Sequence, residues 1–179
     1  MPDIIKILPT EVSNKIAAGE VVQRPSSVLK ELLENSIDAN SSKIKIVIKN
    51  AGKNLIQVID DGQGMSRNDM HKSFVKHATS KINKIDDIFS INSMGFRGEA
   101  LAAIASVSMI EMSSSKLNEN DGYFIELNGG KIISEKELIG NKGTSIKVQN
   151  LFYNVPARRN FLKSDFVELK HIINVFNNI

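Results

Sequence analysis

The sequence of 179 residues contains no cysteine. Without thiols the chain has no disulfide framework, no thiolate zinc site and no cysteine nucleophile, so these three chemistries are excluded. It also lacks a basic N-terminal stretch followed by an apolar run of about 7–15 residues, which a secretory signal requires. No segment approaches the roughly 20 apolar residues of a membrane span. We therefore expect an unexported, cytoplasmic protein that does not enter a membrane.

Several familiar motifs of nucleotide and hydrolase sites are absent as well. The sequence has no G-x-x-x-x-G-K-S/T segment, and Gly62 to Arg67 lacks the third glycine of the dinucleotide fingerprint. There is no G-x-S-x-G elbow, and His71, His77 and His171 do not have the spacing of a metal motif. Any phosphate chemistry must therefore use another architecture.

Composition and charge predict one ordinary domain. Apolar residues make up 41% of the sequence, which is enough for a hydrophobic core. The net charge of +3 permits an anionic partner but is too small to indicate nucleic acid by itself. We expect residues 1–179 to form a single domain. The last predicted helix reaches Ile179 without a glycine or proline stop, which indicates a fragment of a longer chain.

Apolar periodicity predicts alternating helices and strands. The first two helices are expected at 10–18, with a stop at Gly19, and at 28–38, with an N-cap at Ser26 or Ser27. A third helix is expected to begin at the capping box that Ser66 opens and to carry Met70, Phe74 and Ala78 on one face. The remaining two are an alanine-rich helix that continues to about Ser106 and a final helix at 166–176. Strands are expected at 43–49, 55–59, 107–112, 123–127, 131–133 and 144–148, and residues 151–159 read as an irregular aromatic and basic connector.

The helix from Val28 to Asp38 carries one polar stripe beside its apolar face. Glu31, Asn35 and Asp38 recur at the i, i+4 and i+7 positions, so their side chains leave the helix in the same direction. Taken alone, the stripe is better explained as the solvated edge of an ordinary helix, because most charged helix faces simply contact water. The segments that follow it favour a site.

The turn from Asp60 to Met65 follows directly on a predicted strand. Gly62 and Gly64 permit backbone conformations and close approaches that a side chain would block, and the sheet holds the Asp60 carboxylate in place. Such a turn can line a ligand pocket. An ordinary acidic turn remains the alternative, because Asp and Gly are common turn formers.

Two later segments have the composition of phosphate-binding loops. Thr79, Ser80 and Lys81 combine two hydroxyls with an ammonium group, although a capped loop would explain them as well. The glycine-bracketed loop from Met94 to Leu101 feeds an alanine-rich helix, whose free N–H groups and dipole suit a polyphosphate. A hinged loop without a ligand is the alternative.

Six blocks of sequence, taken together and in this order, resemble the N-terminal ATPase region of the MutL family of DNA mismatch-repair proteins. They are Ile16 to Val22, Lys30 to Ala39, Asp60 to Met65, His77 to Lys81, Gly95 to Leu101 and Phe152 to Arg159. The D-x-G-x-G block is shared with gyrase B, histidine kinases and heat-shock chaperones. The last two blocks are more specific to mismatch repair. The resemblance implies the Bergerat-type ATP-binding fold of the α+β class, a two-layer sandwich with a mixed, mostly antiparallel sheet and helices on one face.

The resemblance also implies a role for each matching residue. Glu31 would be the general base for the attacking water, Asn35 would hold Mg²⁺, and Asp60 would accept the adenine amine. Gly62, Gly64, Met65, Ala39 and Thr144 would shape the base pocket, and the lid over the phosphates would comprise Thr79, Ser80, Lys81, Gly95, Phe96, Arg97 and Gly98.

By the same resemblance, ATP hydrolysis would drive a conformational switch or clamp in mismatch repair. ATP would bring two N-terminal regions together, and the full-length protein would act on DNA with mismatch-recognition and downstream repair proteins. The connector with Arg158, Arg159 and Lys163 would contact DNA phosphates, or else pair with local carboxylates.

The sequence departs from the family pattern in two respects, and two other functions compete with the one that the resemblance implies. Asn40 stands where glycine is common in the family, and Asn tolerates the left-handed conformation. In the family a following, transducer domain supplies a lysine to the γ-phosphate, so this fragment alone is expected to bind and turn over weakly. The main alternative is a nucleotide-sensing scaffold or chaperone-like module that does not hydrolyse ATP. A histidine kinase is disfavoured because no phosphoacceptor segment is visible.

Overall fold

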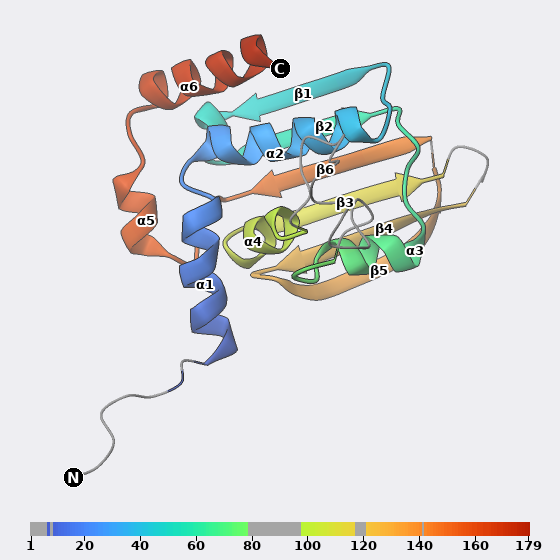
Figure 1. The fold of residues 1–179 in the computed structure, drawn as a ribbon, viewed down its shortest axis with the longest axis horizontal. Helices are drawn as coiled ribbons and strands as arrows, with labels where there is room; N and C mark the ends of the chain where they lie inside the picture. The colour runs from blue at the N-terminus through green and yellow to red at the C-terminus, as the bar shows by residue number, and fades with distance from the viewer. Residues whose placement is uncertain (1–6, 8, 79–97, 117–120, 141) are drawn as a thin grey trace, which may run out of the picture.

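The computed structural model describes residue 7 and residues 9–78, 98–116, 121–140 and 142–179. Six strands form one sheet in the order β1-β2-β6-β3-β4-β5 (Figure 1). The strands are β1 (Ile44–Lys49), β2 (Leu55–Asp60), β3 (Met109–Ser115), β4 (Asp121–Asn128), β5 (Lys131–Ile139) and β6 (Gly143–Gln149). The helices are α1 (Thr10–Val21), α2 (Pro25–Asp38), α3 (Arg67–Ser73), α4 (Ala100–Ser106), α5 (Pro156–Phe161) and α6 (Asp165–Asn178).

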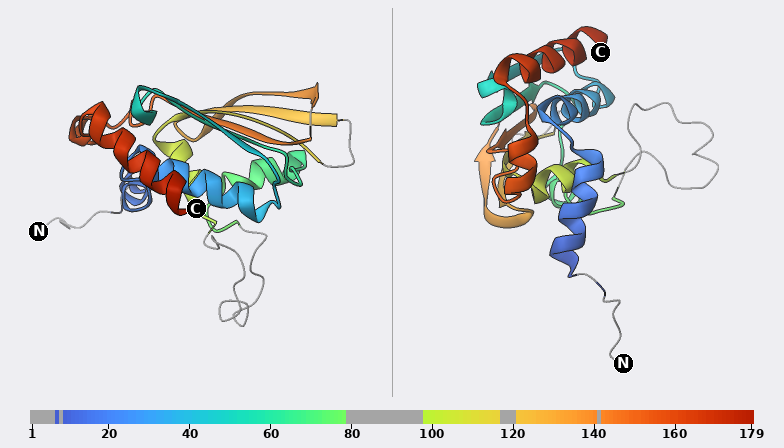
Figure 2. Two further views of the ribbon diagram at one scale, coloured as in Figure 1. Left: turned by 90° about the horizontal axis from the view of Figure 1, so that it is seen from above. Right: turned by 90° about the vertical axis from the view of Figure 1, so that its left-hand side faces the viewer.

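The sheet and the helices form two layers, as Figure 2 shows from above. Every pairing among the described strands is antiparallel, so the predicted mostly antiparallel sheet contains no parallel pair in that part of the chain. The helices lie against one face of the sheet, which confirms the predicted α+β sandwich. None of the helices in the described ranges has the length and apolar character needed to cross a membrane.

Alternation along the strands directs the core toward the helices. In β2, Ile56 and Val58 are buried, whereas the residues between them are partly exposed. Leu29 and Leu32 of α2 pack in the same core, and so does Ile172 of α6, the helix that packs against α2. Burying a leucine side chain contributes about 1.5–3 kcal/mol relative to exposure, so α2 is held by its apolar face. This packing fixes the direction of the polar stripe on α2.

Two predicted helix ends are wrong in informative ways. Helix α1 does not end at Gly19 but continues to Val21, because the side chain of Arg158 binds the carbonyl groups at its C-terminus. Helix α2 begins at Pro25, whose fixed φ suits the first helical position, so Ser26 lies inside the first turn and does not cap it. Arg24 is the N-cap residue, and its side chain makes no cap hydrogen bond.

Other boundaries also differ from the prediction. The strand expected at 131–133 extends to Ile139, and the connector expected to be irregular contains α5. Ser66 does cap α3: its Oγ accepts a hydrogen bond from the Asp69 N–H at 3.1 Å. That helix ends at Ser73, so Ala78 lies beyond it. The positive φ expected at Asn40 is present, at 57°.

Candidate functional site

The carboxylate of Asp60 lies at the end of β2, and 9% of the residue is exposed. Its Oδ1 accepts hydrogen bonds from the N–H of Gly62 at 3.0 Å and of Thr144 at 3.2 Å. Its Oδ2 accepts the Ser36 hydroxyl at 2.8 Å. Two donors occupy Oδ1 and one occupies Oδ2, so Oδ2 keeps the capacity to accept one further donor. The carboxylate is therefore fixed in one orientation and can still bind a donor group.

The adjacent Asp61 has a structural role in joining two loops. Its carboxylate accepts hydrogen bonds from the Ser42 hydroxyl at 2.6 Å, the Ser42 N–H at 2.8 Å and the Lys43 N–H at 2.9 Å. The hydrogen bond from the Ser42 hydroxyl, followed by that from the Lys43 N–H, lowers the pKa of Asp61 to about 2. Asp61 thus ties the turn after β2 to the segment that enters β1, whereas Asp60 faces the core.

The glycines of the turn permit close packing, as the sequence predicted. A Cβ on Gly62 would lie 2.8 Å from the Ala39 Cβ, which belongs to the end of α2. Gly64 has φ +67°, and a Cβ there would lie 1.9 Å from the Ser115 carbonyl oxygen of β3. Larger residues would displace the backbone at both positions. The turn, α2 and β3 therefore converge around Asp60.

Ser36 and Ser114 are polar residues of this region that the sequence prediction missed. Ser114 is 2% exposed, and its Oγ accepts the Met65 N–H at 2.9 Å. The same Oγ lies 2.9 Å from the Thr144 Oγ1 and 3.1 Å from the Gly143 carbonyl oxygen. The sequence signal for Ser114 was weak. It consisted only of a serine at an inward-facing strand position whose neighbouring inward-facing positions are apolar.

The polar stripe on α2 lies beside this network. Glu31, Asn35 and Asp38 belong to one continuous helix, as predicted, and each is partly buried. Ser36, on the same helix, reaches Asp60 directly. Helix α2, which carries the stripe, and the end of β2 are thus joined by a hydrogen bond.

Most of the predicted phosphate-binding residues lie outside the described residues. They are Thr79, Ser80, Lys81, Gly95, Phe96 and Arg97. Gly98 is described, has φ +62°, and would place a Cβ 2.4 Å from the Ala78 carbonyl oxygen. Nearby, the His77 Nδ1 lies 3.0 Å from the Glu99 Oε1. The two residues before segment 79–97, His77 and Ala78, therefore lie against the two residues after it, Gly98 and Glu99.

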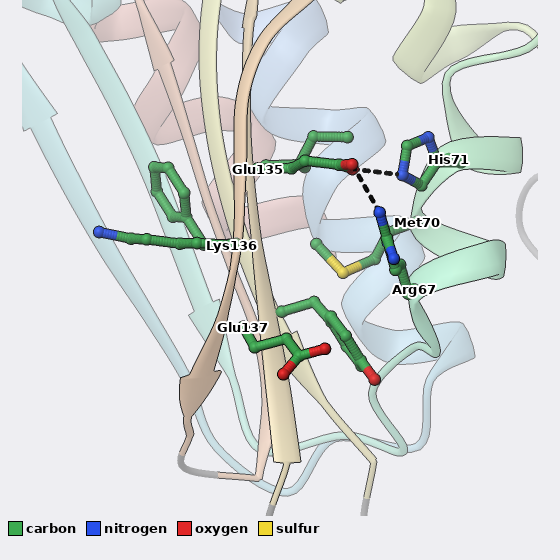
Figure 3. A pocket seen from close by; sticks show the side chains of 9 residues that line it. Arg67, Met70, His71, Glu135, Lys136 and Glu137 are labelled. Carbon is green, nitrogen blue, oxygen red and sulfur yellow. Dashed lines mark hydrogen bonds and ion pairs between the residues drawn. The ribbon is translucent and has the colours of Figure 1, made fainter.

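A small cavity of about 170 Å³ lies elsewhere, between α3 and the edge of the sheet (Figure 3). Glu135 of β5 is the centre of its polar contacts: it binds Arg67 at 2.6 Å and His71 at 2.8 Å. The hydrogen bond from Arg67, which is the largest cause, keeps the pKa of Glu135 below its ordinary value. None of the predicted site residues lines this cavity, and its side chains mainly fasten α3 to β5.

The basic connector divides between internal and exposed side chains. The Arg158 Nη1 donates to the carbonyl oxygens of Gly19 at 3.0 Å and Val22 at 3.2 Å, so this guanidinium is engaged within the domain. Its Cζ lies 6.0 Å from the centre of the Phe152 ring. Arg159 and Lys163 are exposed. Of the three predicted DNA contacts, only the latter two have exposed side chains.

Comparison with known proteins agrees with this arrangement. Residues 23–154 match the family described as "Histidine kinase-, DNA gyrase B-, and HSP90-like ATPase". The match covers most of the chain, so the chain belongs to this family of ATPases.

Within that family, the chain is similar over its full length to the DNA mismatch repair protein MutL. It is 57% identical to MutL of Christiangramia forsetii and 55% identical to MutL of Flavobacterium psychrophilum. All of the chain is aligned in both comparisons, and it spans 29% of the length of each relative. The resemblance to the MutL ATPase region is therefore confirmed.

Solved structures support the same assignment. The Aquifex aeolicus MutL ATPase domain complexed with ADP has a TM-score of 0.66 and 30% identity, covering 87% of this chain and 54% of that chain. The N-terminal domain of a DNA repair protein has a TM-score of 0.75 and 28% identity, covering 91% of this chain and 46% of that chain. The predicted ATP-binding fold is thus confirmed.

Proposed function

We propose that this chain binds ATP with Mg²⁺, hydrolyses the γ-phosphate bond, and so acts as a switch in DNA mismatch repair. The observation that carries the proposal is the fixed carboxylate of Asp60. Its remaining acceptor capacity lies beside a turn whose glycines allow close backbone approach. A buried acceptor of this kind suits the exocyclic amine of adenine.

Glu31 is the proposed general base. It lies on α2, one turn before Asn35, and is partly buried. Partial burial suits a carboxylate that is shielded from bulk solvent but still contacts one water molecule. In the reaction a water oxygen attacks the γ-phosphorus, the water proton passes to the Glu31 carboxylate, and ADP leaves.

Asn35 is the proposed ligand of Mg²⁺, through its amide oxygen. The part of the chain that the structure describes holds no group of three or more acidic or histidine side chains that could enclose a metal ion. Mg²⁺ commonly keeps several waters and takes phosphate oxygens as ligands, so one amide oxygen on α2 fits this chemistry. When bound, the ion would neutralise the charge that develops on the phosphates.

We further propose that Thr79, Ser80, Lys81 and the segment from Gly95 to Gly98 cover the phosphates. The support is their composition and the adjoining positions of Ala78 and Gly98 at the base of the segment. Ala39, Met65 and Thr144 would complete the base pocket. Thr144 of β6 donates its N–H to Asp60, Ala39 follows α2 and adjoins Gly62, and the Met65 N–H binds Ser114.

Further proposals concern the activities of the whole protein, of which we infer this chain to be one part. We propose that nucleotide binding brings two copies of the N-terminal region together in a cytoplasmic complex with DNA and other repair proteins, and that a following domain contributes a lysine to the γ-phosphate. The exposed side chains of Arg159 and Lys163 are the connector's candidates for contacting DNA phosphates.

Calorimetric titration with a non-hydrolysable ATP analogue tests the pocket. Saturable, Mg²⁺-dependent binding is expected for the wild-type chain, and Asp60→Ala should lose it because the adenine amine loses its acceptor. Ser113→Ala, on β3 and partly exposed, is a matched control that should bind like wild type. Equal binding by Asp60→Ala and wild type would contradict the proposed pocket.

A further inference from the structure

Three polar residues stand side by side on neighbouring strands at the floor of the proposed base pocket. In the sheet register, Asp60 of β2 pairs with Thr144 of β6, and Thr144 pairs with Ser114 of β3. Residues that pair directly across a sheet point to the same face, so the three side chains form one row. All three are at most 9% exposed.

The hydroxyl proton of Ser114 can go to only one acceptor. Ser114 lies 3.1 Å from the Gly143 carbonyl oxygen, which can only accept, and 2.9 Å from the Thr144 Oγ1, which can donate or accept. Both short contacts are satisfied at once when Ser114 donates to Gly143 and Thr144 donates to Ser114. The Met65 N–H then supplies the second donor to the Ser114 Oγ, at 2.9 Å. In this arrangement each hydroxyl donates one hydrogen bond, and the Ser114 oxygen accepts two.

The direction of these protons determines what Thr144 offers to a ligand. Because its proton points to Ser114, the Thr144 Oγ1 presents only lone pairs elsewhere. Asp60 presents the remaining lone pair of Oδ2 in the same row. The floor of the pocket therefore consists of acceptors. Such a floor binds an amine and rejects a carbonyl oxygen at the same place.

We propose that Ser114 is a positioning residue that sets base specificity, by holding the Thr144 hydroxyl as an acceptor and so favouring 6-aminopurine over 6-oxopurine nucleotides. This inference rests on the proposed ATP site and deepens it. Ser114 acts through Thr144 and Met65 and does not itself contact the base. Loss of its hydroxyl frees the Thr144 proton to turn toward the pocket and donate to a 6-oxo group.

The test compares non-hydrolysable analogues of ATP and ITP, which differ in the 6-amino or 6-oxo group. The ratio of their dissociation constants is measured by calorimetry in the presence of Mg²⁺. Wild type should favour the ATP analogue, and Ser114→Ala should reduce that preference about tenfold, since one hydrogen bond changes its partner. Ser114→Thr keeps a hydroxyl at this position and should restore the wild-type ratio.

The matched control is Ser113→Ala. Ser113 pairs with Ser145, one position along the strand, so it belongs to the opposite face of the sheet. This variant should keep the wild-type ratio. Partial unfolding of any variant lowers the affinity for both analogues alike, so the ratio reports only on folded molecules.

The outcomes separate the inference from the proposed function. A wild-type ratio in Ser114→Ala, with the ATP analogue still bound, overturns the role of Ser114 and leaves the ATP site standing. Absence of ATP binding by the wild-type protein overturns the proposed site, and the inference with it. A reduced ratio in Ser114→Ala together with a wild-type ratio in Ser114→Thr supports the proposal.

Discussion

The guanidinium of Arg158 occupies the space that a side chain at Gly19 would need. A Cβ on Gly19 would lie 1.5 Å from the Arg158 Nη2, and the Nη1 donates to the Gly19 carbonyl oxygen at 3.0 Å across 139 residues of sequence. The same nitrogen also binds the Val22 carbonyl oxygen, so a cation closes the C-terminus of α1. Arg158 thereby joins the first helix of the domain to the connector before α6.

Replacing Gly19 should therefore destabilise the protein. Alanine in place of a helical glycine normally adds about 0.5–1 kcal/mol of stability. Here the new methyl group would displace Arg158, and we expect Gly19→Ala to lower the free energy of unfolding by about 1–2 kcal/mol because two hydrogen bonds are lost. Urea denaturation followed by circular dichroism measures the change.

A double-mutant cycle provides the control for this prediction. In an Arg158→Ala background the methyl group has room, so Gly19→Ala should be neutral or stabilising. If Gly19→Ala raised the stability of the wild-type background, the steric relationship between the two residues would be refuted.

The depressed pKa of Asp61 predicts a specific acid sensitivity. Its pKa is about 2 in the folded state against 3.8 ordinarily, so the folded state favours the ionised form. Its contribution to stability is present above pH 3.8 and is lost as the pH falls from there toward 2. Asp61→Asn should therefore lower stability at neutral pH and flatten the pH dependence over this window.

Urea denaturation of the wild type and Asp61→Asn between pH 2 and pH 6 checks this expectation. Asp69→Asn is a suitable comparison, because it also removes a surface carboxylate that binds a serine hydroxyl. If the difference in the free energy of unfolding between wild type and Asp61→Asn stayed constant through the acid range, Asp61 would not be the cause of the acid sensitivity.

Gly98 should be required at the base of the proposed phosphate lid. It combines a φ of +62° with a position where a Cβ would lie 2.4 Å from the Ala78 carbonyl oxygen. Gly98→Ala should weaken binding of the ATP analogue at least tenfold, because Ala78 and Gly98 can no longer adjoin. Gly130→Ala tests backbone strain alone, since Gly130 has φ +84° but its Cβ would be 3.6 Å from the nearest atom. That control should lose stability and keep nucleotide affinity; equal affinities for the two variants would count against the lid.

The main helices and strands of the core were predictable because they carry strong patterns, and the family resemblance supplied their arrangement in two layers. The alternation of β2 and the apolar face of α2 place their buried residues without reference to the rest of the chain. The end of β5 was missed because this edge strand is exposed nearly throughout, with Glu135, Lys136 and Glu137 in its centre. Charged residues protect sheet edges, so such a strand resembles a loop in sequence.

The site was predictable only where local sequence specifies it. Helical spacing places Glu31 and Asn35 together, and the glycines around Gln63 indicate close packing. Ser36, which is 24 residues from Asp60, was not predicted, and Thr144, which is 84 residues away, was placed near Asp60 only through the family resemblance. Long-range hydrogen bonds of serine and threonine leave no periodic signal. The same holds for Arg158, whose contact with α1 depends on the path of the connector.

The most direct test of the central claim is to measure ATP turnover and ATP binding side by side for wild type and Glu31→Ala in the full-length protein. If Glu31 is the general base, turnover should fall by about 10²–10⁴-fold while Mg²⁺-dependent binding stays within a few fold of wild type. Glu34→Ala, on the same helix and paired with Lys30 at 3.6 Å, should change neither quantity by more than a few fold. Undiminished turnover in Glu31→Ala, or a wild-type protein that binds ATP without ever hydrolysing it, would contradict the account and favour a nucleotide-sensing module.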